Sequence, residues 1–111
     1  DGFAAIIAQT APRLAWLMPD FHNPTGRCMD ALTRQRVADI AARTRTTLVI
    51  DETMVDLWYN APPPPPLACF NPDAAVLTIG SAGKSFWGGL RIGWIRADRE
   101  LIWALLYILL F

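Results

Sequence analysis

Five polar side chains lie at the end of an apolar run or in a turn beyond one: Asn23, Asp51, Ser81, Lys84 and Arg91. A lysine amine can condense with an aldehyde, and an arginine can bind a phosphate through two parallel hydrogen bonds. A carboxylate can pair with a protonated ring nitrogen, and an amide can donate to a phenolate oxygen. Together these groups suit an aldehyde cofactor that carries a phosphate and a pyridine ring, namely pyridoxal 5'-phosphate (PLP).

Each of these roles has an ordinary alternative. Asp51 ends an apolar strand, where an unpaired carboxylate costs free energy, but it also suits a helix cap or a salt bridge. Asn23 precedes Pro24, which favours an extended backbone, and an ordinary turn explains it as well. Lys84 needs a neutral amine, which burial and the positive charge of Arg91 favour, whereas a loop lysine is usually solvated. The Gly and Lys spacing does not match a nucleotide-binding phosphate loop.

The elements around these residues predict a parallel sheet. The run Ala15–Met18 reads as a buried strand, a helix begins at the N-cap Asp30, and Thr47–Ile50 reads as the next strand. A strand-helix-strand unit of this kind has a right-handed crossover. Ligands of such sheets bind beyond the carboxyl ends of the strands, which is where Asn23 and Asp51 fall.

The remaining elements follow from the same patterns. The helix has an apolar stripe formed by Leu32, Val37, Ile40 and Ala41. The pattern predicts that three arginines face solvent: Arg34, Arg36 and Arg43. The third and fourth strands are predicted at Ala75–Ile79 and Leu90–Ile95, with Lys84 in the glycine-rich loop between them. The five prolines Pro62–Pro66 predict a stiff exposed loop, and the alternative is a ligand for a proline-binding groove.

Composition bounds the classes of protein that the chain can belong to. With 111 residues and a formal net charge of zero, it has the size of one domain and no basic stretch for nucleic acid. Cys28 and Cys69 are not spaced like metal ligands, and His22 is the only histidine. Two scattered cysteines favour a protein of the reducing cytoplasm over a disulfide framework.

The apolar run 101–111 is too short to span a bilayer. It predicts a core helix without its neighbours, with a truncated end and a membrane anchor as further alternatives. Because the chain starts at Asp1, we expect a piece of a larger protein.

The motifs taken together resemble the class I/II aminotransferase family of PLP fold type I, over about residues 13–99. The resemblance implies an α/β fold, a partial large domain with a mainly parallel sheet and flanking helices. It places Asn23 on the phenolic oxygen of PLP and Asp51 on the ring nitrogen. Lys84 would hold the cofactor as a Schiff base, and Ser81 and Arg91 would bind its phosphate.

The amino-acid sequences of three segments are most similar to one branch of that family. The segments 19–26, 51–53 and 84–94 resemble the aminotransferase-like domain of MocR-type regulators in the GntR family. Two positions depart from the wider family: Met54 replaces a tyrosine that bonds the phenolic oxygen, and Gly83 replaces a serine. Methionine cannot donate a hydrogen bond, and glycine removes a possible contact to the phosphate or the lysine. Both changes weaken the case for efficient transamination.

Three functions stay open at this point. The first is the PLP-binding effector core of a MocR-type transcription regulator, which responds to an amino acid or amine. The second is part of an aminotransferase that moves an amino group between an amino acid and a 2-oxo acid. The third is an inactive fragment. For the parent protein the resemblance implies a cytoplasmic homodimer that reaches DNA only through a winged helix absent from this chain, with no membrane partner.

Overall fold

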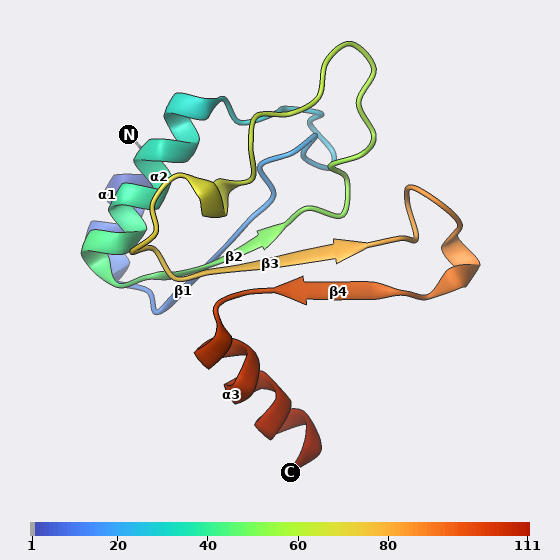
Figure 1. Cartoon of the computed structure of the whole chain (residues 1–111). Helices are drawn as coiled ribbons and strands as arrows, with labels where there is room; N and C mark the ends of the chain where they lie inside the picture. Colours follow the sequence, from blue (N-terminus) through green and yellow to red (C-terminus); the bar gives the residue numbers. More distant parts are fainter. Residues whose placement is uncertain (1) are drawn as a thin grey trace.

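The computed structural model describes residues 2–111, in which four strands form one sheet with the order β1-β2-β3-β4 (Figure 1). Their bounds are Leu14–Leu17 (β1), Thr47–Asp51 (β2), Val76–Ser81 (β3) and Gly93–Arg96 (β4). β1, β2 and β3 are parallel, whereas β4 pairs with β3 in the antiparallel sense. The mainly parallel α/β architecture predicted from the sequence is confirmed.

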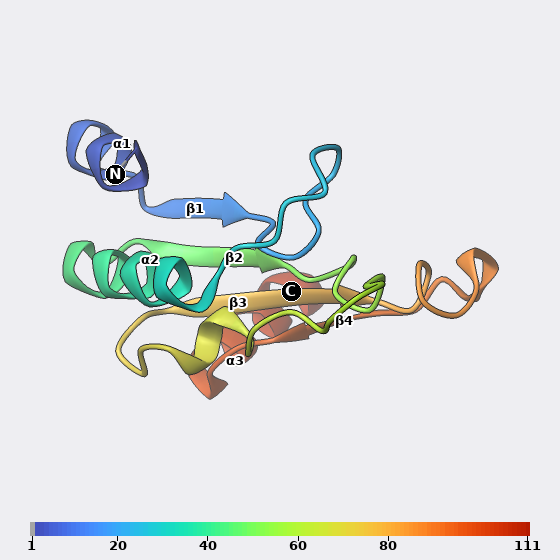
Figure 2. The same cartoon turned by 90° about the horizontal axis from the view of Figure 1, so that it is seen from above.

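Helices cover both faces of the sheet. Their bounds are Gly2–Thr10 (α1), Ala31–Thr44 (α2) and Arg99–Leu110 (α3), with single 3-10 turns at Leu67–Cys69 (η1) and Gly88–Leu90 (η2). Figure 1 shows α1 and α2 on one side of the sheet and α3 on the other, and Figure 2 gives the view from above. The α2 crossover between β1 and β2 is the predicted strand-helix-strand unit.

The core lies between α2 and the sheet. It contains Val37, Ala38 and Ala41 from the helix, Leu48 and Ile50 from β2, Val76 from β3, and Leu67 from η1. Because side chains alternate along a strand, Val49 and Asp51 of β2 face the side opposite to Leu48 and Ile50. This alternation places Asp51 on the face that α2 does not cover.

Helix α2 begins where the sequence predicts. Asp30 is its N-cap, and the side-chain oxygen Oδ1 accepts a hydrogen bond from the backbone N–H of Thr33 at 2.7 Å. Hydrogen bonds from the side chain and backbone of Thr33 hold the pKa of the Asp30 carboxyl below its usual value. Arg45 is the C-cap: its backbone is left-handed, with a φ of 55°, and its N–H donates to the Ala41 carbonyl.

Two predictions about α2 are wrong. The sequence pattern places Leu32 in the apolar stripe, but its side chain is 61% exposed. The same pattern places Arg34 in solvent, but it is fully buried and forms an ion pair with Asp20. Both errors follow from the helical spacing: residues 34, 37, 38 and 41 share the core-facing stripe, and residue 32 lies outside it.

The strand predictions need two corrections. The sequence predicts a buried first strand, but β1 is an edge strand, and Leu14 and Trp16 are more than half exposed. It predicts a fourth strand from Leu90, but β4 starts at Gly93. The 3-10 turn η2 and the left-handed Arg91 (φ 54°) interrupt the extended run before it.

Helix α3 is apolar and largely exposed. Asp98 caps its first turn through a 2.8 Å hydrogen bond from the backbone N–H of Leu101. The side chains of Trp103, Tyr107 and Ile108 are all more than half exposed. A cavity of about 530 Å³ separates α3 from β3 and β4. Within residues 2–111, no helix has both the length and the apolar character to cross a membrane.

Candidate functional site

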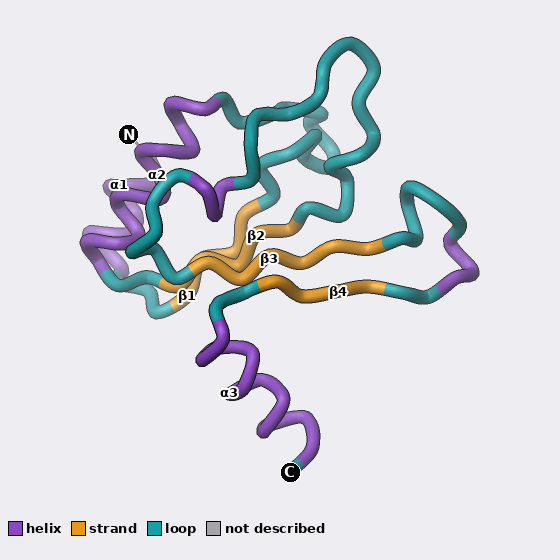
Figure 3. The backbone as a smooth tube through the Cα atoms, viewed as in Figure 1, coloured by secondary structure: helices purple, strands orange, loops and turns teal. Residues whose placement is uncertain are grey.

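The loops that follow the parallel strands gather at one edge of the sheet. Figure 3 shows the teal loops after β1, β2 and β3 at the carboxyl ends of these strands. The loop with Asn23 follows β1, Asp51 is the last residue of β2, and Ser81 is the last residue of β3. This edge is where an open parallel sheet binds ligands, as the sequence predicted.

The strand register brings Asp51 close to the end of β3. Asp51 is paired with Ile79, and Ser81 lies two residues beyond Ile79 on the same face. The Asp51 oxygen Oδ1 accepts hydrogen bonds from the backbone N–H of Thr53 at 3.0 Å and from its hydroxyl at 2.7 Å. Thr53 therefore orients the carboxylate. In residues 2–111 no hydrogen bond occupies Oδ2, so this oxygen can face a ligand.

Ser81 and Arg91 line one cavity. This cavity of about 270 Å³ is lined by Ser81, Gly83, Gly88, Arg91, Ile92 and Gly93. A Cβ on Gly83 would lie 3.3 Å from the Ser81 oxygen, and a Cβ on Gly88 would lie 3.7 Å from the Gly83 carbonyl oxygen. Glycines therefore keep the space open beside a hydroxyl and a guanidinium. A hydroxyl and a guanidinium are a donor set that fits a phosphate such as that of PLP.

A tight turn presents Lys84. The backbone N–H groups of Phe86 and Trp87 both donate to the carbonyl of Ala82, at 3.0 and 3.3 Å, so Lys84 lies inside the turn that they close. The lysine side chain is exposed, as the alternative of a solvated loop lysine expects. Lys84 does not line the cavity of Ser81 and Arg91.

Asn23 belongs to a loop that is closed on itself. The N–H of His22 donates to the Arg27 carbonyl at 2.9 Å, and the N–H of Gly26 donates to the His22 carbonyl at 2.6 Å. Asn23 is exposed at the tip. Within residues 2–111, no hydrogen bond or ion pair joins its side chain to Asp51 or Lys84. The five predicted residues thus share an edge of the sheet, and one pair of them shares a cavity.

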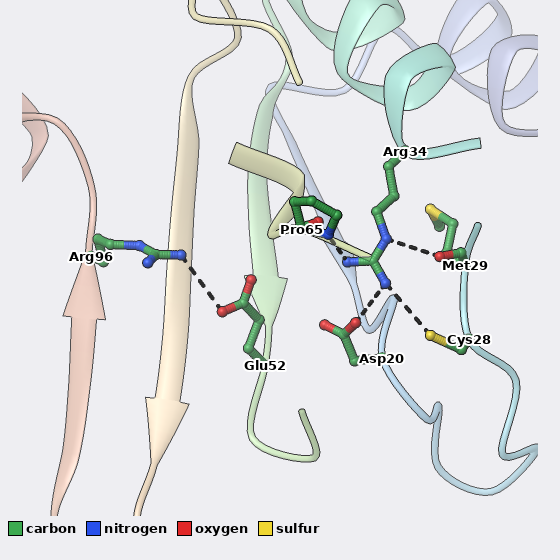
Figure 4. Close-up of polar contacts among 7 residues, drawn as sticks. All are labelled: Asp20, Cys28, Met29, Arg34, Glu52, Pro65 and Arg96. Carbon is green, nitrogen blue, oxygen red and sulfur yellow. Dashed lines mark hydrogen bonds and ion pairs between the residues drawn. The ribbon is translucent and has the colours of Figure 1, made fainter. Parts of the chain in front are cut away.

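Sequence reasoning missed a cluster of charges beneath this edge. The cluster contains Asp20, Arg34, Glu52 and Arg96 (Figure 4). Asp20 and Arg34 are buried, and Asp20 Oδ2 and Glu52 Oε1 have no hydrogen-bond partner within residues 2–111. The helical spacing of residue 34 with Val37, Ala38 and Ala41 was the signal that could have revealed this burial.

The pKa of Glu52, one of the two carboxylic acids in this cluster, is raised above its ordinary value. Burial is the largest cause that raises its pKa, and the nearby carboxylate of Asp20 adds to the rise. The positive charges of Arg96 and Arg34 oppose it. The nearest Arg96 nitrogen lies 3.7 Å from Glu52 Oε2, so the two groups form only a long ion pair.

Comparisons with known proteins agree with this geometry. The family model described as aminotransferase class I and II matches residues 15–108. The HTH-type transcriptional regulators YdfD and YisV of Bacillus subtilis are 38% and 31% identical, over 76% and 85% of this chain. The chain spans only 17% and 19% of their lengths.

Enzymes are similar as well. Aromatic-amino-acid aminotransferase 1 of Thermococcus litoralis is 29% identical over 81% of the chain and 22% of its own length. The structure of LysN, an α-aminoadipate aminotransferase from Thermus thermophilus, superimposes with a TM-score of 0.87 at 25% identity. That superposition covers 97% of this chain and 28% of LysN. LysN was crystallised in complex with N-(5'-phosphopyridoxyl)-L-leucine.

Proposed function

This chain belongs to the aminotransferase class I and II family, and from this premise we propose that it is a PLP-binding core. We place this core in the aminotransferase-like effector domain of a MocR-type regulator of the GntR family. The residues that would hold PLP are Asn23, Asp51, Ser81, Lys84 and Arg91. The supporting observation is that Asp51 pairs with Ile79 of β3, two residues before Ser81, and that Ser81 and Arg91 line one cavity together with three glycines.

Each residue has a task that follows from its chemistry. Bound PLP would supply an electron-accepting ring that is joined to the protein through an amine. Arg91 and Ser81 would hold the phosphate, one through a planar guanidinium and the other through a hydroxyl. Asp51, oriented by Thr53, would keep a proton on the ring nitrogen. Asn23 would donate a hydrogen bond to the phenolic oxygen.

Lys84 is the only lysine in the sequence. Its amine would hold the cofactor and could also carry a proton as a general acid or base. The exposed turn that carries Lys84 leaves the amine accessible to an aldehyde. Only the α-amine at the start of the chain offers a second amino group, so a covalent label is simple to assign.

The regulator is favoured over the enzyme by sequence. The sequences of segments 19–26, 51–53 and 84–94 resemble those of the MocR-type regulators. Two regulators of Bacillus subtilis match most of the chain. Met54 and Gly83 lack the hydroxyl groups that aid transamination in the wider family. The second candidate is part of an aminotransferase, which the likeness to the Thermococcus enzyme and to LysN supports. The proposed partners are an amino acid or amine and a second copy of the parent protein.

PLP binding is tested by absorbance and chemical trapping. The purified protein is titrated with PLP, reduced with borohydride and digested, and the label is located by mass spectrometry. We expect a visible absorption band and a label at Lys84, and neither in Lys84→Arg. A matched control is Arg43→Lys. This variant has a second lysine in the chain, exposed on α2, and that lysine should not receive the label. A missing band, or a label spread over Lys84 and the α-amine, would refute the proposal.

The regulator and the enzyme differ in the chemistry that comes after PLP binding. Amino acids are added to the PLP-loaded parent protein, and conversion of PLP to its amino form is monitored by absorbance. An aminotransferase converts the bound cofactor and releases a 2-oxo acid. A regulator whose chemistry stops after the amine exchange shows a spectral change without release of that acid. Release of a 2-oxo acid at a rate typical of enzymes, on the order of 1 per second or faster, would establish the second candidate instead.

A further inference from the structure

The buried guanidinium of Arg34 lies at the base of the loop that carries Asn23. Its Nη2 atom is 2.6 Å from Asp20 Oδ1, at the start of the loop, and its Nε donates to the Met29 carbonyl at 2.9 Å, at the end (Figure 4). A backbone hydrogen bond from Met29 to the Pro19 carbonyl, 2.7 Å long, closes the same base. Arg34 therefore joins both ends of the loop at once.

The same guanidinium also contacts a third segment. Nη1 donates to the carbonyl of Pro65 at 3.3 Å. Within the loop 20–29 itself, Nη2 lies 3.6 Å from the thiol of Cys28. Arginine offers N–H donors in a planar fork, so it can serve several acceptors in fixed directions, whereas a lysine amine cannot. The side chains of Arg34 and Asp20 are 0% and 1% exposed, and loss of either partner would leave a buried charge without compensation.

We propose that Arg34 is a positioning residue for Asn23, because its guanidinium fixes both ends of the loop 20–29 and thereby the direction of the Asn23 amide. This inference rests on the proposed function, in which Asn23 bonds the phenolic oxygen of PLP. Arg34 makes no hydrogen bond to Asn23 and does not line the cavity of Ser81 and Arg91, so its effect on the Asn23 amide passes through the loop 20–29. Asp20 is its anchor.

The first test uses the protein without PLP. Amide hydrogen exchange is compared in Arg34→Lys and in the control Arg36→Lys, which changes an exposed arginine two residues further along α2. We expect the loop amides of His22 and Gly26 to exchange about tenfold faster in Arg34→Lys. The amide of Leu48, which bonds the Ala75 carbonyl at 2.8 Å, should be unchanged. The control should resemble the parent protein.

Two results of this test overturn the inference. Unchanged exchange of the loop amides would show that Arg34 does not hold the loop. Equal acceleration at Leu48 would show that the residue only stabilises the fold. If Arg34→Lys does not fold, Asp20→Asn replaces it, since this variant removes the charge of the anchor and keeps its size.

The second test reads the amide of Asn23 through bound PLP. An amide donor stabilises the deprotonated phenolic oxygen, so its loss strengthens the hold on the proton shared between that oxygen and the Lys84 nitrogen. We therefore expect the pH midpoint of the visible absorption change to rise in Asn23→Ala and, to a smaller extent, in Arg34→Lys. In the double variant Asn23→Ala/Arg34→Lys, the midpoint should equal that of Asn23→Ala. A further rise in the double variant would contradict a role through Asn23.

The two tests separate this inference from the proposed function. If the parent protein takes up no PLP, the proposed function fails, and the exchange of the loop amides still decides whether Arg34 holds the loop. If the parent protein takes up PLP and Arg34→Lys keeps both the parent exchange and the parent midpoint, the proposed function stands and the role of Arg34 is refuted.

Discussion

At the scale of single residues, the fold brings the two proposed phosphate donors, Ser81 and Arg91, to one cavity. The sequence could assign Ser81 and Arg91 only through their motifs. The chain brings them together because η2 and the left-handed backbone of Arg91 return the loop to the end of β3. Arg91 has a left-handed backbone with a φ of 54°, a conformation that few residues other than glycine adopt, and no local sequence pattern predicts it at an arginine.

Arg91→Lys is expected to weaken PLP binding. Lysine keeps the positive charge but loses the second hydrogen bond of the guanidinium fork. A hydrogen bond to a charged group contributes about 1.5–3 kcal/mol, so the dissociation constant should rise about tenfold or more. Titration of PLP absorbance measures the change, with Arg99→Lys on α3 as the control. Equal affinity in Arg91→Lys and the parent protein would show that the phosphate binds elsewhere.

Glu52 gives the stability of the fold a dependence on pH. Its pKa in the folded state is raised above the ordinary value of 4.5, chiefly by burial, so the folded protein binds the proton more tightly than the unfolded chain. Stability therefore falls as the pH rises from about 4.5 toward the raised value, where the folded protein also loses the proton. Below this window the Glu52 carboxyl is neutral in both states, so the free-energy cost of burying its charge is absent.

Glu52→Gln should remove this dependence. Glutamine stays neutral, so the variant should gain free energy of unfolding relative to the parent protein at pH 7 but not at pH 4. Urea unfolding at both values measures the difference, and Glu100→Gln at the exposed start of α3 serves as the control. A constant difference between variant and parent over this range would contradict a carboxyl that titrates with a raised pKa.

At the scale of elements, local sequence signals predicted where helices and strands begin better than they predicted which residues are buried. The cap at Asp30 and the β-branched run of β2 depend on neighbouring residues, and the structure confirmed both. The burial of Arg34 and the exposure of β1 depend on what packs against them, and both predictions were wrong. An apolar run predicts a strand, but whether the strand is central or at an edge depends on its partners.

The contact between β3 and β4 depends on a glycine. A Cβ on Gly80 would overlap the indole of Trp94, its cross-strand partner. Gly80→Ala should therefore displace the indole and cost about 1–3 kcal/mol of unfolding free energy, measured by urea unfolding. In a Trp94→Ala background the same change should cost much less, because the overlap is gone. Gly2→Ala is the control, since nothing lies within 4 Å of the position where its Cβ would be.

At the scale of the whole molecule, the two faces of the sheet differ in their cover. On one face, α2 and η1 bury a continuous core. On the other, α3 lies across a cavity of about 530 Å³, and its outer side remains apolar. The sequence predicted a core helix that lacks neighbours, and the helix is present with few contacts in residues 2–111. Only the tertiary arrangement shows which of its sides faces β3 and β4 (Figure 1).

This outer side of α3 predicts self-association of the isolated chain. Its exposed apolar side chains are Trp103, Tyr107, Ile108, Leu109, Leu110 and Phe111, and an apolar surface of this kind promotes association in water. The double variant Ile108→Lys/Phe111→Lys changes two residues that do not line the cavity between α3 and the sheet. The variant should therefore keep the circular dichroism spectrum of the parent chain.

Light scattering over a range of concentrations measures the association. We expect the mean mass of the parent chain to increase with concentration and that of the double variant to stay nearer to one chain. The control Arg36→Lys/Arg43→Lys, on the exposed side of α2, should associate like the parent chain. A double variant that associates as strongly as the parent would assign the association to another surface, such as the exposed Leu14 and Trp16 of the edge strand β1.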